Sequence, residues 1–184
     1  AAKFGWGPFG QNLEADEAHV RAAREGLGRD VRLLVDAGTI WGEDVEQAAA
    51  RLPILHECDV LWLEEPFVSG ALHAYADLAQ RMKSPLRTAA GEGSHEPHMA
   101  RNLIDFGRVG YIQIDAGRIG GLTSAHEIAR YAAARNVTYV NHTFTTPLAL
   151  SASLQPFAGL KDHQLCEYPT QSSTLAQTLT TGGP

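Results

Sequence analysis

Ionisable side chains recur at regular intervals along this chain, each directly after a short apolar segment. The series consists of Asp36, Glu64, Glu92, Asp115, His142 and Glu167. A single acid in such a place is most often a helix N-cap or a solvated loop residue. A series of six predicts a shared location instead, because independent caps need not fall each time on the first residue after the apolar segment.

Carboxylates gathered at one location repel one another. At neutral pH they must be protonated or neutralised by a cation. This series offers hard oxygen ligands, no thiolate and little imidazole. That donor set favours Mg²⁺, with Mn²⁺ as the alternative.

The segments that position these residues alternate between two kinds of pattern. Short apolar runs predict strands at 1–4, 31–35, 60–63, 86–90, 111–114, 137–140 and 164–166. Amphipathic stretches predict helices at 16–27, 43–55, 71–82, 98–106, 123–135 and 147–154. Strict alternation demands a parallel sheet covered by helices, either doubly wound or closed as a (β/α) barrel. In a barrel, the carboxyl ends of the strands form one rim, where the active site lies.

The length of the chain bears on which fold is expected. It has 184 residues, whereas a complete eightfold barrel needs about 250, and it opens almost directly on a predicted strand. We therefore expect an α/β fold of the TIM-barrel type that lacks its first βα unit. Residues 1–168 are expected to form the barrel. Residues 169–184, rich in Thr, Gln, Ser and Gly, are expected to form a loop-like tail.

Composition excludes several classes of partner. The formal net charge of −6 disfavours nucleic acid and anionic membranes. No apolar run approaches the roughly 18 residues of a membrane span, and no signal-peptide pattern opens the chain. Cys58 and Cys166 lack metal-type spacing. We interpret both as buried thiols in a reducing compartment, which makes the cytoplasm the expected location.

Five motifs resemble those of the enolase superfamily, and within it the mandelate racemase/muconate lactonizing enzyme family. They are VDA at 35–37, WLEEP at 62–66, AGEG at 90–93, IDAGRIGG at 114–121 and NHTF at 141–144. Their order and spacing together are highly specific, and the resemblance extends from residue 3 to residue 167. It implies the C-terminal barrel domain of that superfamily, a modified (β/α)₇β barrel.

The resemblance also implies roles for individual residues. The expected Mg²⁺ ligands are Asp36, Glu64 and Glu92, with Glu65 as second choice to Glu64. Asp115 and His142 match a dyad in which His142 is the general base or acid. Glu167 matches an acid that hydrogen-bonds the substrate carboxylate, and Lys3 matches the second lysine of a Lys-x-Lys motif.

The reaction implied is removal of the proton beside a carboxylate. The leading expectation is dehydration of a sugar acid to a 2-keto-3-deoxy product, by an enzyme that is homo-oligomeric in its full-length form. The alternatives are a racemase, epimerase or cycloisomerase of the same superfamily. An alternative of another class is a non-catalytic barrel fragment that acts only through association.

Three departures from the family pattern affect this expectation. Ala1 stands where the first lysine would fall, which weakens a two-base racemase. Gly38 stands where the family often has Asn. The N-terminal capping domain is absent from the sequence, so we expect a piece of a longer enzyme.

Other side chains have both a functional and a structural interpretation. Trp6 and Phe9 could line a sugar-acid pocket or pack within a loop. Arg118 could pair with a distal substrate carboxylate. His95 and His98 could lie near the metal, although loop histidines are the more ordinary interpretation.

Overall fold

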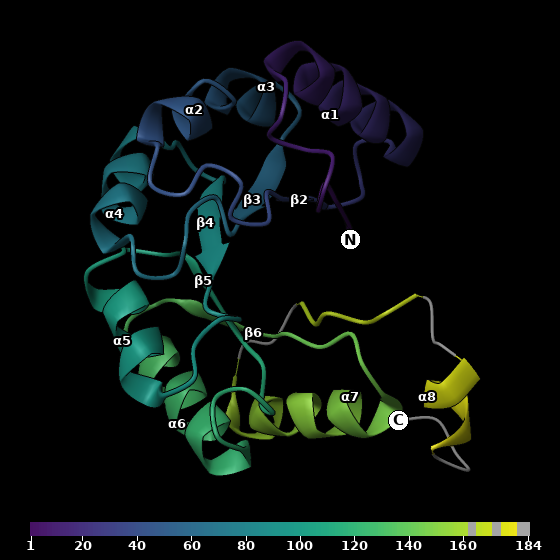
Figure 1. Ribbon diagram of the computed structural model, residues 1–184, viewed down its shortest axis with the longest axis vertical. Coiled ribbons are helices and arrows are strands. Elements are labelled where there is room, and N and C mark those ends of the chain that lie inside the picture. The colour runs from purple at the N-terminus through teal and green to yellow at the C-terminus, as the bar shows by residue number, and fades with distance from the viewer. Residues whose placement is uncertain (162–164, 171–173, 180–184) are drawn as a thin grey trace. The chain divides into compact units, whose positions relative to one another are not determined.

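The structure, a computed structural model, describes residues 1–161, 165–170 and 174–179. Strands and helices alternate along the chain (Figure 1). They group into two compact units. The first comprises Ala1–Ala90 with Asp105–Tyr111, and the second comprises Gly91–Ile104 with Ile112–Pro184.

The first unit is built on four parallel strands that follow one another in chain order. These are β1 (Ala2–Phe4), β2 (Leu33–Asp36), β3 (Val60–Glu64) and β4 (Arg87–Ala90). Its helices are α1 (Leu13–Leu27), α2 (Val45–Ala49), α3 (Leu52–Glu57) and α4 (Leu72–Arg81). Every residue of β2 is buried, as expected for a parallel strand covered on both faces.

The second unit contains the remaining elements. In chain order they are α5 (Pro97–Asp105), β5 (Tyr111–Ile114), α6 (Leu122–Ala133), β6 (Thr138–Asn141), α7 (Pro147–Leu154), the 3₁₀ helix η1 (Gln155–Gly159) and α8 (Thr174–Thr178). Tyr111 of β5 and Asp105 of α5 belong to the first unit. The backbone N–H of His142 donates to the carbonyl of Ile114, 2.9 Å away, so the ends of β5 and β6 are held together.

Local sequence explains several of the boundaries. Helix α1 begins where the Asn12 side chain accepts a hydrogen bond from the Ala15 N–H, and α7 begins the same way at Thr146. Gly91 passes so close to β5 that a Cβ there would lie 2.8 Å from the Gln113 carbonyl oxygen. Glycine is therefore required immediately before Glu92.

The predicted α/β class is confirmed as a partial (β/α) barrel, with six strands in the part of the chain that the structure describes. The predicted strand at 164–166 is wrong for Leu165 and Cys166, which form no strand, and Gln164 lies outside the described residues. The expected tail at 169–184 contains α8. Cys58 is buried as expected, but Cys166 is exposed.

The single helix predicted for 43–55 is two helices. Pro53 lies in the first turn of α3, a place that proline tolerates because the N–H there has no helical partner. Within one continuous helix the same proline would remove a hydrogen bond and clash with the preceding turn. None of the helices in the described residues has the length and hydropathy that crossing a membrane requires.

Candidate active site

Two of the predicted metal ligands are neighbours in the first unit. Asp36 and Glu64 end β2 and β3, and the register of these parallel strands pairs them directly. Lys3 reaches both from β1. Its Nζ lies 2.5 Å from Glu64 Oε1 and 3.5 Å from Asp36 Oδ2. The structure thus brings three predicted site residues together, with the Lys3 ammonium between the two carboxylates.

Both carboxylates are oriented by local hydrogen bonds. The Gly38 N–H donates to Asp36 Oδ1 at 2.9 Å, and the Trp62 indole N–H donates to Glu64 Oε2 at 3.1 Å. One oxygen of each carboxylate is therefore held by the protein, while the other lies beside the Lys3 ammonium. We did not predict a role for Trp62. It lies two residues before Glu64, and the two-residue period of a strand places both on one face.

This arrangement fits a bound divalent cation. The donors are hard carboxylate oxygens, the Glu64 side chain is fully buried, and the Lys3 ammonium marks a position where one cation faces both acids. Among the described residues, no group of three or more His, Cys, Asp or Glu side chains that could hold a metal ion is found. The third predicted ligand, Glu92, belongs to the second unit, and the full ligand set stays a prediction.

The second unit brings His142 together with two carboxylates. His142 Nδ1 lies 3.0 Å from Asp115 Oδ2, and His142 Nε2 lies 3.0 Å from Glu92 Oε2. The His142 side chain is 6% exposed. The predicted contact between Asp115 and His142 is therefore present, and the ring bridges the two acids.

The electrostatics of this group favour a charged imidazolium between two carboxylates. Burial alone would lower the pKa of His142, but its hydrogen bonds with Asp115 and Glu92 raise it to about 9. Burial opposes ionisation of Glu92 and Asp115 as well. The hydrogen bonds and charges of His142 and Arg118 together outweigh burial at Glu92 and lower its pKa. At Asp115, the hydrogen bond from His142 together with those from the Gly117 and Arg118 backbone does the same.

Arg118 contacts Glu92 in this structure. Its Nη1 lies 3.2 Å from Glu92 Oε1 and 3.3 Å from the Glu92 carbonyl oxygen. The guanidinium also lies over the Phe144 ring, whose edge meets His142. Asp115 is held by its own turn, since its Oδ1 accepts hydrogen bonds from the N–H groups of Gly117 and Arg118. The other carboxylate oxygen of Asp115 is the one that contacts His142.

Glu167 is placed next to this group by Asn141, for which the sequence predicts no role. The Asn141 amide accepts from the Glu167 N–H at 2.8 Å and donates to the Glu167 carbonyl at 3.0 Å. Glu167 Oε2 in turn accepts from the Thr143 N–H at 2.9 Å. The side chain of Asn141 thus supplies the two hydrogen bonds that a strand ladder would have made. Its position directly before His142 was the available signal.

The other residues that had both a functional and a structural interpretation are Trp6, Phe9, His95 and His98. Phe9 is 1% exposed and packs edge-on against Trp41, so it is a loop-packing residue. Trp6 is 76% exposed. His95 and His98 are exposed, and His98 Nδ1 lies 3.2 Å from Glu96.

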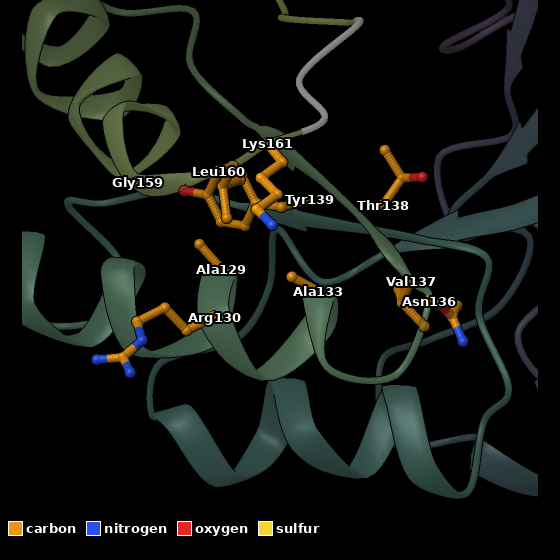
Figure 2. Close-up of a pocket in the computed structure, with 10 residues that line it drawn as sticks. All are labelled: Ala129, Arg130, Ala133, Asn136, Val137, Thr138, Tyr139, Gly159, Leu160 and Lys161. Atoms are coloured by element: carbon orange, nitrogen blue, oxygen red, sulfur yellow. The ribbon is translucent and has the colours of Figure 1, made fainter.

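A cavity of about 570 Å³ lies elsewhere in the second unit. It lies between α6, η1 and the beginning of β6, where Arg130, Tyr139 and Lys161 are among the lining residues (Figure 2). Thr138 and Tyr139 start β6, whereas His142 follows its other end. None of the predicted site residues lines this cavity.

Comparison with known proteins identifies the family. The family model described as "Enolase C-terminal domain-like" matches residues 1–184. The chain belongs to this family.

Two curated relatives have about the same identity to the chain and different activities. D-galactarolactone cycloisomerase from Agrobacterium fabrum is 31% identical over 83% of the chain and 39% of the relative. L-rhamnonate dehydratase from Saccharopolyspora erythraea is 32% identical over 72% of the chain and 33% of the relative. The chain thus spans less than half the length of these relatives.

Solved structures are similar over most of the chain. A predicted mandelate racemase from Rhodobacter sphaeroides is 60% identical with a TM-score of 0.89, over 95% of this chain and 44% of that one. A racemase from Streptomyces coelicolor A3(2) with bound magnesium is 29% identical with a TM-score of 0.68, over 77% of this chain and 37% of that one.

Proposed function

We propose that this chain carries the catalytic residues for Mg²⁺-dependent removal of the proton beside a carboxylate, with dehydration of a sugar acid as the reaction. The observation that carries the proposal is the Asp115–His142 contact of 3.0 Å. A carboxylate on Nδ1 fixes the tautomer of the ring and leaves Nε2 for proton transfer. The aldonate or aldarate substrate and the 2-keto-3-deoxy product are proposed by analogy with relatives such as L-rhamnonate dehydratase.

The divalent ion would be held by Asp36, Glu64 and Glu92. When bound, it stabilises the negative charge that develops on the carboxylate oxygens as the neighbouring C–H is deprotonated. The oriented oxygens of Asp36 and Glu64 support two of these three ligand assignments.

His142 is proposed to take the α proton on Nε2 or to protonate the leaving β-hydroxyl. In the present structure, Nε2 is hydrogen-bonded to Glu92, and the raised pKa of His142 keeps the ring charged at neutral pH. The ring therefore has to leave this bond and lose its Nε2 proton before it can accept the α proton, whereas the charged ring can already protonate the leaving β-hydroxyl. Asp115 would keep its bond to Nδ1 and stabilise the imidazolium that forms. Glu167, oriented by the Thr143 N–H, is proposed to hydrogen-bond the substrate carboxylate.

Lys3 is proposed to act from the opposite face of the substrate. Its contacts with Asp36 and Glu64 support a place in the site. Because Ala1 replaces the first lysine of the motif, we assign the principal proton transfer to His142.

A racemase, epimerase or cycloisomerase reaction is the second candidate. It is favoured by the similarity to D-galactarolactone cycloisomerase, which is as great as the similarity to the dehydratase. Each of these reactions begins with the same proton abstraction. They differ in whether the deprotonated acid then loses a hydroxyl group, is protonated again or undergoes ring closure or opening.

Incubation with a set of aldonic and aldaric acids in D₂O with MgCl₂ tests the proposal. A 2-keto-3-deoxy product indicates dehydration, and deuterium in recovered substrate indicates racemisation or epimerisation. Glu64→Gln should abolish turnover, and His142→Asn should lower it about 100- to 10,000-fold. Glu43→Gln, at an exposed glutamate, is the matched control. No Mg²⁺-dependent turnover in the unmodified chain would contradict the proposal and favour a non-catalytic, associating chain.

A further inference from the structure

The loop after β1 exposes one large aromatic side chain and buries its neighbours. Trp6 is 76% exposed, whereas Phe9, Trp41 and Trp62 are 1%, 8% and 3% exposed. Leaving an indole in water forgoes the stabilisation that its burial would provide. An exposed tryptophan next to a predicted site therefore requires an explanation from its surroundings.

A buried network holds this loop in place. The Gly10 N–H donates to Asp16 Oδ1 at 2.9 Å, and the Gly10 carbonyl accepts from the Trp41 indole at 3.0 Å and from Arg51 at 3.2 Å. Arg51 and Asp16 form an ion pair of 3.0 Å whose side chains are 3% and 1% exposed. The exposure of Trp6 is therefore a feature of an anchored loop.

Two glycines let the loop lie against the segment that carries Asp36. Gly5 has φ +123°, and a Cβ there would lie 2.4 Å from the Asp36 carbonyl oxygen. Gly38 has φ +58°, and a Cβ there would lie 3.0 Å from Trp6 Cδ1. The indole of Trp6 thus lies over Gly38, where a side chain at position 38 would stand.

The turn beneath the indole is the one that orients a predicted metal ligand. The Gly38 N–H donates to Asp36 Oδ1, so Trp6 covers a residue that contacts the Asp36 carboxylate. The indole N–H of Trp6 makes no hydrogen bond with the residues that the structure describes. Trp6 therefore offers an aromatic surface and a donor beside the Gly38 turn that orients Asp36.

We propose that Trp6 is a specificity-determining residue that packs against the carbon chain of the bound acid. The C–H groups of a polyhydroxy acid would lie on the indole, and its hydroxyl groups would remain available to polar partners. The inference rests on the proposed function, because it takes the acid at the Asp36–Glu64 site as the ligand.

The fluorescence of Trp6 provides a direct test. The chain has three tryptophans, and the other two are buried, so Trp6 should account for most quenching by acrylamide. D-galactonate or L-rhamnonate, added with MgCl₂, should reduce this quenching, and Trp6→Phe should remove the response. Gly38→Asn should alter the Trp6 emission without ligand, because a side chain there meets the indole. An unchanged quenching constant with both acids and the full aldonic acid set would overturn the inference.

Kinetics separate this inference from the proposed function. Trp6→Ala should raise the KM for the preferred acid about 5- to 10-fold, with kcat within about twofold. Phe106→Ala, at another exposed aromatic (63%), is the control and should leave KM unchanged. Turnover by the unmodified chain with an unchanged KM in Trp6→Ala would refute the role of Trp6 alone. Equal acceptance of aromatic 2-hydroxy acids would show that the indole does not select for a polyhydroxy chain.

Discussion

Each carboxylate at the candidate site uses its two oxygens differently. Asp36 and Glu64 each give one oxygen to a local N–H donor and turn the other toward Lys3. Asp115 divides its oxygens between its own turn and His142. Because one oxygen is fixed, the direction of the other is set before any ligand arrives, which is the preorganisation that charge stabilisation requires.

Lys3→Met should strengthen Mg²⁺ binding by the metal-free chain. The Lys3 ammonium and the ion compete for the same oxygens, so its removal should lower the half-saturating Mg²⁺ concentration about tenfold. Thermal unfolding followed across a MgCl₂ series measures this. Lys83→Met, at an exposed lysine, should behave like the parent chain. Weaker binding in Lys3→Met would show that Lys3 does not compete with the ion.

His142 should make the metal-free chain less stable as the pH rises. Its pKa in the folded state, about 9, exceeds the ordinary value of 6.5. The folded chain therefore holds this proton more tightly than the unfolded chain does. The resulting stabilisation is complete below about pH 6.5 and is lost as the pH rises through about 9.

Urea unfolding in EDTA between pH 6 and 10 tests the contribution of His142. His142→Asn should flatten the fall in free energy of unfolding across this range. His19→Asn, at an exposed helix position, should keep the slope of the parent chain. If the free energy of unfolding of His142→Asn fell with pH as steeply as that of the parent chain, His142 would not be the group responsible.

At the scale of elements, the segment that carries Glu167 is attached to β6 by a side chain. Asn141→Ala removes both amide hydrogen bonds to residue 167. The Glu167 N–H should then exchange with solvent at least about tenfold faster, because its acceptor is gone. Hydrogen exchange resolved at single residues measures this. Ser153→Ala, which removes another partner of Asn141, is the control, and unchanged exchange in Asn141→Ala would refute the attachment.

The sequence predicts where strands and helices lie better than it predicts where a helix is interrupted or how the chain runs after the last strand. Each of the six strands β1 to β6 ends within one residue of its predicted end, and all but β2 also begin within one residue of the predicted start. Apolar runs bounded by polar residues leave little choice of where a strand lies. The break between α2 and α3 depended on Pro53, whose meaning the continuous amphipathic pattern concealed. The apolar character of Leu165 and Cys166 predicts a strand, but the next residue, Glu167, bonds through its backbone to the Asn141 side-chain amide and not to a strand ladder.

Of the candidate site, the sequence predicts the residues that we propose to do chemistry and misses those that orient them. Asp36, Glu64, Asp115 and His142 were recognisable because they follow strands in series. Trp62 and Asn141 were not, because an indole or amide within a strand has many ordinary roles. Which oxygen a donor contacts depends on rotamers that no spacing encodes.

At the scale of the whole molecule, the stability of the chain should depend on the buried pair of Asp16 and Arg51. Arg51→Met leaves Asp16 as an uncompensated buried charge and should cost about 3–5 kcal/mol of the free energy of unfolding. Equilibrium urea unfolding measures the loss. Arg21→Met, at an exposed ion pair with Glu57, should cost about 1 kcal/mol or less. Equal losses in the two variants would contradict the importance of burial.

The contact of Lys3 with Asp36 and Glu64 bears on how such a protein is made. Two acids at the paired ends of β2 and β3 would repel each other and oppose folding until an ion arrived, unless the polypeptide carried a counterion of its own. Lys3 is that internal counterion. Under the proposed function, a newly synthesised chain would complete this part of its fold while free magnesium is scarce and acquire the ion afterwards, so that assembly and loading would be separate events.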